Sequence, residues 1–324
     1  MPRLTPTTEI RIEPSTRCNY HCTMCSRDTF RRRREVMTNA RFERIVSQAR
    51  QTLPHLALCT VSGFGELATD PHWKDKLALA RTFFPRVHVV TNLSLVADRD
   101  LADLARLATE VRVSLSAVDD ETLQAIHRPP ALVSYAQLAA RIQRLAEHRS
   151  AEFSLRLTCS ALPENEALLE QWIETWQPLV DGLEIWRPHN WVTGQRFRKT
   201  DGKRVASCGR PATGPLQVQV DGTMNVCCFD YNGEMLIGDL NRQTFAEILT
   251  GEPLARIRHL HATGGADELP LCARCDQREP NAQRARYLIY STEPAEVRVR
   301  QTSSGRETLA EIALSPHDEP GGAI

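Results

Sequence analysis

Six short apolar segments, each followed by a helical pattern, constrain the fold of this chain more than any other feature. They are rich in Val, Ile and Leu, as strands buried in parallel sheets are. The segments are residues 8–13, 56–61, 87–91, 111–116, 153–159 and 182–186. Six strand–helix units in a row predict a parallel sheet with right-handed crossovers. Because six units are too few to close an eight-stranded barrel, we expect an α/β fold with an open, partial (βα)6 TIM-like barrel.

Amphipathic helical patterns lie between these strands. Apolar residues recur there at the three- and four-residue spacing that places them on one helix face. The clearest patterns cover residues 39–50, 98–108, 132–148 and 163–176. The last of them starts with a proline and acidic residues, which is typical of a first helical turn.

The pattern changes after residue 186. Residues 215–229 alternate in character around Asp221 and Gly222, which predicts a β-hairpin with an Asp-Gly turn. Residues 241–261 are helical on either side of a Gly-Glu-Pro break. We therefore expect a barrel domain, a small domain of a β-hairpin plus helix, and a loosely ordered tail. The expected boundaries are residues 1–190, 191–290 and 291–324.

Composition excludes several classes of partner. The chain has 324 residues with 40 basic and 40 acidic side chains, so it lacks the charge footprint of nucleic-acid or anionic-membrane binding. No apolar run approaches the roughly 20 residues of a membrane helix, and the N-terminal residues do not form a secretory signal. We expect a cytoplasmic protein, in which ten cysteines indicate thiols or metal ligands rather than disulfides.

Three cysteines follow directly on the first predicted strand. Cys18, Cys22 and Cys25 have the spacing C-x3-C-x2-C. Four thiolates usually hold a 4Fe–4S cluster, so three would leave one iron open to a small molecule. In a parallel barrel, the loops after the strands are where catalytic residues gather. The alternative is structural zinc with a fourth ligand such as His21.

This spacing after the first strand of a βα series resembles the radical S-adenosylmethionine (SAM) superfamily. The resemblance implies that the open iron binds the amino and carboxylate groups of SAM. It also implies reductive cleavage of SAM to a 5′-deoxyadenosyl radical, which takes a hydrogen atom from the substrate. An electron donor of the flavodoxin or ferredoxin type is implied as a partner.

Further positions resemble the cofactor-binding segments of that superfamily. The sequence SGFGEL resembles its glycine–glutamate motif, although Leu67 stands where a proline is usual. The alternative for this motif is an ordinary turn at the end of a strand. For Ser114 and Ser116 on the fourth strand, the alternative is that they are serines of the core. The resemblance implies cofactor contacts from Gly63, Gly65, Glu66, Asn92, Ser114, Ser116 and Arg156. The two serines are two positions apart on a predicted strand and are therefore expected on one face.

A second set of cysteines lies in the C-terminal part. Four of them could close a cluster without an open iron: Cys208, Cys227, Cys272 and Cys275. The last two form C-x2-C, a spacing that suits zinc or iron–sulfur. The layout resembles the shortened SPASM, or Twitch, domain, which implies one auxiliary 4Fe–4S cluster. A zinc ribbon is the alternative, and Cys228 could replace Cys227 as a ligand.

The remaining cysteines bear on the type of reaction. Cys59, Cys159 and Cys228 are either buried filling or thiols that donate hydrogen to a substrate radical. The overall cysteine layout is similar to that of the 2-deoxy-scyllo-inosamine dehydrogenases. This similarity favours an oxidoreductase acting on a small polar or aminocyclitol-like substrate. The alternatives are a peptide or protein maturase, an epimerase, or a non-catalytic iron–sulfur or zinc-binding protein.

Overall fold

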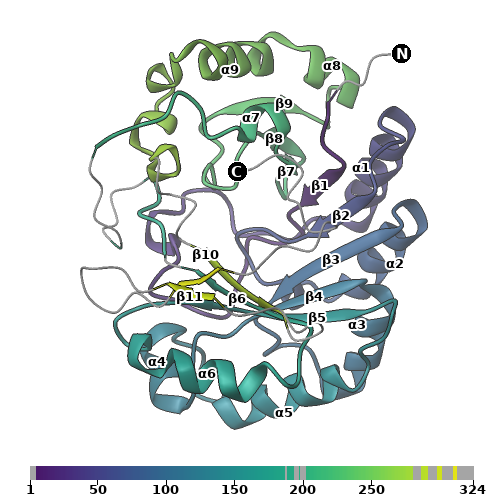
Figure 1. Cartoon of the computed structure of the whole chain (residues 1–324). Coiled ribbons are helices and arrows are strands. Elements are labelled where there is room, and N and C mark those ends of the chain that lie inside the picture. Colours follow the sequence, from purple (N-terminus) through teal and green to yellow (C-terminus); the bar gives the residue numbers. More distant parts are fainter. Residues whose placement is uncertain are drawn as a thin grey trace.

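The computed structural model describes residues 5–186, 188–192, 197 and 202–279, together with three strands beyond residue 285. All six predicted barrel strands are present, and each pairs in parallel with the next along the chain. The strands are β1 (Glu9–Ile12), β2 (Leu58–Val61), β3 (Arg86–Thr91), β4 (Glu110–Ser114), β5 (Ser154–Ser160) and β6 (Gly182–Trp186). The predicted partial (βα)6 barrel is therefore confirmed (Figure 1).

Helices cover the outer face of this sheet (Figure 1). They are α1 (Asn39–Thr52), α2 (Trp73–Phe83), α3 (Leu101–Leu107), α4 (Asp120–Ile126), α5 (Tyr135–Ala146) and α6 (Leu169–Trp176). Local sequence explains where several of them begin. Thr38 caps α1 by accepting a hydrogen bond from the Arg41 amide, and Ser134 forms a capping box with Gln137 at α5. Among the described helices, none combines the length and apolar character needed to cross a membrane.

The two faces of the barrel strands differ in chemistry. Outward residues such as Ile10, Ile12 and Leu155 are fully buried against the helices. The inward positions instead carry polar and charged side chains. They include Glu9, Arg11, Thr60, His88, Glu110, Arg112, Arg156, Thr158 and Glu184. The barrel interior is therefore a polar, ion-paired surface rather than a second apolar core.

The C-terminal hairpin extends the barrel sheet. The predicted strands are β7 (Leu216–Val218) and β8 (Thr223–Asn225), and Gly222 in their turn has a φ of 92°. β7 lies parallel to β1, and a third strand, β9 (Leu236–Asp239), pairs with β8. Ten strands of the described chain thus form one sheet, in the order β10-β6-β5-β4-β3-β2-β1-β7-β8-β9.

The helices of the C-terminal part follow the predicted break. α7 (Arg210–Thr213) precedes the hairpin, and α8 (Phe245–Thr250) and α9 (Glu252–Thr263) meet at Gly251. Pro253 stands in the first turn of α9, where its missing amide hydrogen costs no helical hydrogen bond. In Figure 1, α8 and α9 lie at the end of the molecule opposite α5.

Three strands lie beyond residue 285, and the sequence analysis predicted none of them. β10 (Arg286–Tyr290) pairs antiparallel with β6 and forms the far edge of the barrel sheet, although it lies within the range expected for the second domain. β11 (Arg298–Arg300) and β12 (Leu309–Glu311) pair with each other. The expectation of a loosely ordered tail over residues 291–324 stays a prediction, since the structure describes only these two strands of it.

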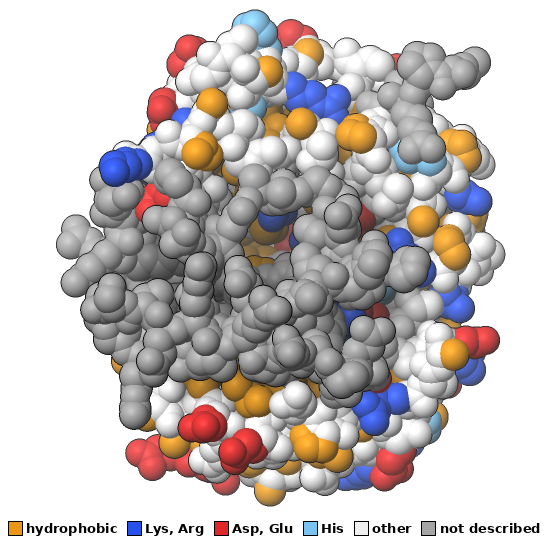
Figure 2. Space-filling model, in the orientation of Figure 1, with side chains coloured by type: hydrophobic (Ala, Val, Ile, Leu, Met, Phe, Trp, Pro, Cys, Tyr) orange, Lys and Arg blue, Asp and Glu red, His pale blue; other side chains and the backbone are white. Residues whose placement is uncertain are grey.

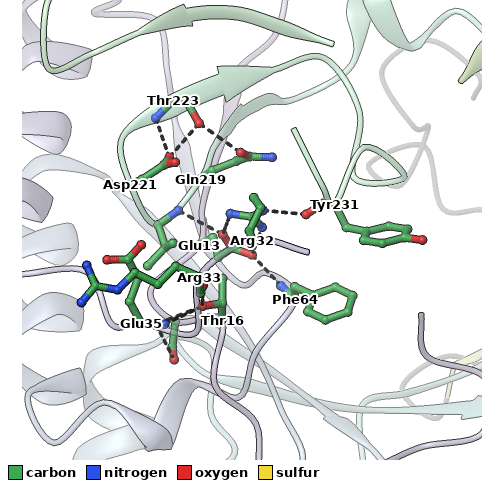
Figure 3. A network of polar contacts seen from close by, with 12 residues as sticks. Glu13, Thr16, Arg32, Arg33, Glu35, Phe64, Gln219, Asp221, Thr223 and Tyr231 are labelled. Atoms are coloured by element: carbon green, nitrogen blue, oxygen red, sulfur yellow. Dashed lines mark hydrogen bonds and ion pairs between the residues drawn. The ribbon is translucent and has the colours of Figure 1, made fainter. Parts of the chain in front are cut away.

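Glu13, directly after β1, ties three segments together. Its carboxylate accepts two hydrogen bonds from the Arg32 guanidinium, at 2.8 and 2.9 Å. It also accepts one from the Phe64 amide and one from the Val220 amide, each at 3.0 Å. Figure 3 shows the carboxylate between these groups. Because Glu13 is 6% exposed, these contacts replace water around a buried charge.

We predict that Glu13→Ala lowers the free energy of unfolding by about 3–5 kcal/mol, because it leaves the guanidinium of Arg32 buried without its partner. Urea unfolding of the metal-free protein measures this change. Glu234→Ala is the matched control, since its partner Arg31 is largely exposed, and it should cost at most about 1 kcal/mol. Equal losses in the two variants would show that Glu13 has no special structural role.

Candidate active site

The carboxyl ends of the barrel strands open into a cavity of about 1460 Å³. Residues of the barrel, of the loop after β1 and of the C-terminal part all line it. The middle of the face in Figure 2 is hollowed, and charged and hydrophobic side chains are visible inside the hollow. Both predicted sets of thiols border this one cavity: Cys18, Cys22, Cys25, Cys208, Cys227, Cys272 and Cys275.

The loop that carries the first three cysteines is held against the end of α4. The amide of His21 donates to the His127 carbonyl at 3.2 Å, and the amide of Thr23 donates to the Ile126 carbonyl at 2.8 Å. Burial raises the pKa of Cys22 above its usual range and that of Cys25 to about 11, and neighbouring thiolates add to both shifts. The charges of the three thiolates therefore interact, as the charges of ligands around one shared group would.

The donor set fits an iron–sulfur cluster. Three cysteine sulfurs face one cavity, and thiolates are the ligands that such clusters use. His21, the fourth ligand of the zinc alternative, instead has its Nε2 atom 3.6 Å from Asp28, and both side chains are largely exposed. Among the described residues, no three His, Cys, Asp or Glu side chains are arranged to hold a single metal ion.

The two glycines of SGFGEL are required by contacts within the protein. A Cβ atom on Gly63 would lie 2.2 Å from Cγ of Glu13. One on Gly65 would lie 2.4 Å from the carbonyl oxygens of Ser15 and Arg17. The amide of Gly65 donates to the Ser15 carbonyl at 3.1 Å. These glycines thus allow the loop after β2 to pack against the chain that leads to the cysteines.

Glu66 joins the same loop to the end of β3. Its Oε1 atom accepts from the Thr91 hydroxyl at 2.5 Å, and its Oε2 atom accepts from the Asn92 amide at 2.7 Å. Asn92 in turn donates from Nδ2 to the Asn19 side chain, within the cysteine loop. Burial raises the pKa of Glu66, and these hydrogen bonds oppose the shift. Glu66 and Asn92 both border the cavity, so a bound cofactor would meet this network.

One expectation for the fourth strand is corrected, and one for the fifth strand stays a prediction. β4 ends at Ser114, so Ser116 is not on the strand, although both serines border the cavity. Ser116 is buried, and its hydroxyl accepts a hydrogen bond from the Ser160 amide at 2.9 Å. Arg156 does not line the cavity, and its guanidinium donates to Glu110 at 2.8 Å. Its predicted contact with the cofactor stays a prediction, and the ion pair with Glu110 already gives this side chain a partner within the protein.

The second set of cysteines is distributed over the opposite wall of the cavity. The charge of Cys208 contributes to the raised pKa values of Cys272 and Cys275, and the charge of Cys275 contributes to the raised pKa of Cys227. The Cys227 thiol donates to the Cys228 sulfur and holds the pKa of Cys228 well below its usual range, with a further contribution from the Arg210 guanidinium. The Arg210 guanidinium thus acts on both adjacent thiols, and Cys275 also acts on Cys227.

The three remaining thiols differ in their access to the cavity. Cys59 is fully buried among outward core residues and does not line the cavity, which favours buried filling over the role of hydrogen donor. Cys159 borders the cavity but is 1% exposed, and its sulfur contacts Asn165 at 3.5 Å. Cys228 is exposed to the cavity.

Several functional candidates were missed in the sequence. Arg11, Arg112 and Glu184 form the charged floor of the cavity, with Arg112 lying 3.2 Å from Glu184. The period-two alternation EIRI and EVRVS could have placed Arg11 and Arg112 on the inner face. His127 and His261, each beside one cysteine of a set, gave no signal, because only the folded chain brings them to the sulfurs.

An aromatic group lies where the two parts of the chain meet. The ring of His189 lies 4.1 Å from that of Trp191 and 4.2 Å from that of Phe229. Trp191 borders the cavity and donates from Nε1 to the Met24 carbonyl at 2.8 Å. Trp191 therefore both borders the cavity and connects the C-terminal part of the chain to the first cysteine loop.

Comparison with protein families identifies the class of protein. The model of the radical SAM superfamily matches residues 12–162, and that of the SPASM iron–sulfur cluster-binding domain matches residues 208–276. The chain thus contains a radical SAM domain. More particularly, it is a radical SAM enzyme with a C-terminal SPASM domain. These domains imply a 4Fe–4S cluster, auxiliary iron–sulfur binding and SAM as cofactors.

Solved structures of similar fold include enzymes bound to different substrates. BtrN in complex with AdoMet and 2-DOIA is 15% identical, with a TM-score of 0.59, over 83% of this chain and 93% of that one. Streptococcus suis SuiB bound to precursor peptide SuiA is 12% identical, with a TM-score of 0.63, over 76% of this chain and 65% of that one.

A third similar structure is anSMEcpe with bound AdoMet and Kp18Cys peptide. It is 12% identical, with a TM-score of 0.60, over 83% of this chain and 89% of that one. At these identities the likeness shows the fold alone. A search of curated proteins gave no match.

Proposed function

We propose that this protein is a radical SAM oxidoreductase of the dehydrogenase type, acting on a small polar substrate such as a sugar or aminocyclitol. The observation that supports this proposal best is the chemistry of the cavity between the two sets of thiols. Its floor presents paired guanidinium and carboxylate groups together with the hydroxyls of Ser114 and Thr158. Hydroxyl and amino groups of a polyol are suited to such a surface, since each can donate or accept.

The proposal for the ligand sets is supported by the cavity that both groups of thiols border. We assign Cys18, Cys22 and Cys25 to the SAM-binding cluster, and Cys208, Cys227, Cys272 and Cys275 to one auxiliary cluster. When bound, the first cluster and SAM would supply a 5′-deoxyadenosyl radical that removes one hydrogen atom. The closed auxiliary cluster would accept one electron. The electron that starts the reaction would come from a flavodoxin- or ferredoxin-type protein.

The protein's own residues then have separate tasks. Gly63, Gly65, Glu66, Asn92, Ser114 and Ser116 surround the cofactor. Arg112 and Arg11 orient substrate oxygens at the floor. Oxidation of an alcohol to a ketone releases a hydrogen atom, an electron and a proton. The carboxylate of Glu184, which accepts from Nε1 of Trp186 at 3.2 Å, is placed to take the proton from the substrate hydroxyl.

A second candidate function is epimerisation, which the position of Cys228 favours. Cys228 exposes its sulfur to the cavity, unlike Cys59 and Cys159. In this reaction the Cys228 thiol would return a hydrogen atom to the substrate radical from the opposite face. The sulfur radical left behind would regain one electron from a reductant of the iron–sulfur type and one proton from water. Cys227 gives up its own proton on binding iron, so it no longer donates to the Cys228 sulfur.

We predict that the anaerobically reconstituted protein, reduced with dithionite, converts SAM to 5′-deoxyadenosine. Liquid chromatography with mass detection measures the product. Cys22→Ala removes one ligand of the first cluster and should abolish the product. A fully reconstituted, reducible wild-type protein that makes no 5′-deoxyadenosine would contradict the enzyme proposal and favour a non-catalytic iron–sulfur protein.

We predict about eight irons per chain, in two 4Fe–4S clusters. Cys227→Ala should lower the iron content to about four, because it opens the auxiliary set. Cys228→Ala is the matched control and should keep about eight. Iron and sulfide analysis measures both variants. Loss of iron in the Cys228 variant alone would reverse the assignment of the adjacent cysteines.

For the epimerase candidate, Cys228→Ala should leave 5′-deoxyadenosine formation within about twofold of wild type but stop product formation from an active sugar or aminocyclitol. Wild-type product formed in D2O should contain one deuterium at the reacting carbon. Cys159→Ala, at a buried thiol, serves as the control. Unchanged product from the Cys228 variant would exclude this thiol as the donor and leave the dehydrogenase reaction.

A further inference from the structure

The end of α4 contacts both the backbone and a sulfur of the first cysteine loop. His127 follows directly on this helix and is 2% exposed. Its carbonyl accepts from the His21 amide, next to Cys22. Its imidazole Nδ1 atom lies 3.4 Å from the Cys22 sulfur. The same residue thus fixes the position of the loop and reaches one of its sulfurs.

The other side of the imidazole determines which nitrogen bears the proton. The backbone amide of Ser116 donates to Nε2 of His127 at 2.7 Å. A backbone amide can only donate, so Nε2 has no proton and Nδ1 of the neutral ring has one. The atom that faces Cys22 is therefore an N–H group. The ring has little freedom to turn, because the Tyr20 ring lies 5.9 Å away and the site is buried.

His261 provides a contrast at the second set of thiols. Its Nε2 atom lies 3.4 Å from the Cys272 sulfur, and its Nδ1 atom lies 2.9 Å from the Ser207 hydroxyl. A hydroxyl can donate or accept, so the tautomer of His261 is not fixed by that contact. Only the histidine beside Cys22 is held as a donor by a backbone amide.

We propose that His127 is a positioning residue that holds a neutral N–H donor on the Cys22 sulfur and raises the reduction potential of the SAM-binding cluster. The proposal rests on the assignment of Cys22 as a ligand under the proposed function. A hydrogen bond to a cluster sulfur stabilises negative charge there, and the reduced cluster has more negative charge than the oxidised one. A higher potential makes the cluster easier for its electron donor to reduce, at the cost of a smaller driving force for electron transfer to SAM.

Two substitutions separate the donor from the rest of the side chain. In His127→Asn the amide nitrogen can occupy the place of Nδ1 and keep the donor to Cys22. In His127→Gln the amide reaches toward the place of Nε2, which keeps a partner for Ser116 but removes the donor. His261→Gln is a control that leaves the first cluster untouched. The probe is the holoenzyme with SAM, titrated electrochemically while the signal of the reduced cluster is followed by electron paramagnetic resonance.

We expect a more negative midpoint potential for the SAM-responsive cluster in His127→Gln, and values close to wild type in His127→Asn and His261→Gln. An unchanged midpoint potential in His127→Gln would overturn the inference. Equal shifts of the potential in His127→Gln and His127→Asn would overturn it as well. If the wild-type cluster does not respond to SAM, the proposed function fails instead, together with the ligand assignment.

A measurement on the unaltered protein covers the case in which the variants fold poorly. Wild-type protein labelled with 15N-histidine should show a weak nitrogen coupling and an exchangeable-proton coupling to the reduced first cluster in electron–nuclear double resonance. Absence of both couplings would show that no histidine N–H contacts this cluster and would overturn the inference.

Discussion

The carboxylate of Glu13 is the constraint on which the arrangement of the site depends. It receives donors from the segment after the cysteine loop, from the glycine loop and from the C-terminal hairpin. A buried carboxylate needs such donors, and each of the three segments supplies at least one. One side chain at the end of the first strand therefore sets how the two groups of cysteines lie relative to each other.

The glycine loop and Glu66 continue this framework toward the cavity. Gly63 leaves room for the side chain of Glu13, and Gly65 lets two backbones approach to hydrogen-bonding distance. Glu66 then connects the loop to the end of β3. Residues that sequence comparison associates with the cofactor therefore have internal structural partners as well. Their contribution to the reaction includes keeping the cysteine loop in position.

The fold could be predicted from the sequence because the outward strand positions are apolar and the helices between them are amphipathic. The pairing of β7 with β1 could not, since the register between segments about 206 residues apart leaves no local pattern. The spacing of the cysteines likewise identified them as candidate ligands, but no sequence pattern pointed to His127 and His261 beside them. The spacing also left two roles open for Cys59, because the side of the strand that a cysteine faces is settled only by the pairing of the strands.

The position of β1 in the sheet has a consequence for synthesis of the chain. β1 is flanked by β2 on one edge and by β7 on the other, and β7 ends at Val218. One edge of β1 therefore stays unpaired until about two thirds of the chain has left the ribosome. The cysteine loop follows β1 directly, so its final shape also waits for the hairpin. Insertion of the first cluster is thus coupled to completion of the C-terminal part. In a truncated chain, the three thiols would lie in a loop next to a strand that lacks one of its pairing partners.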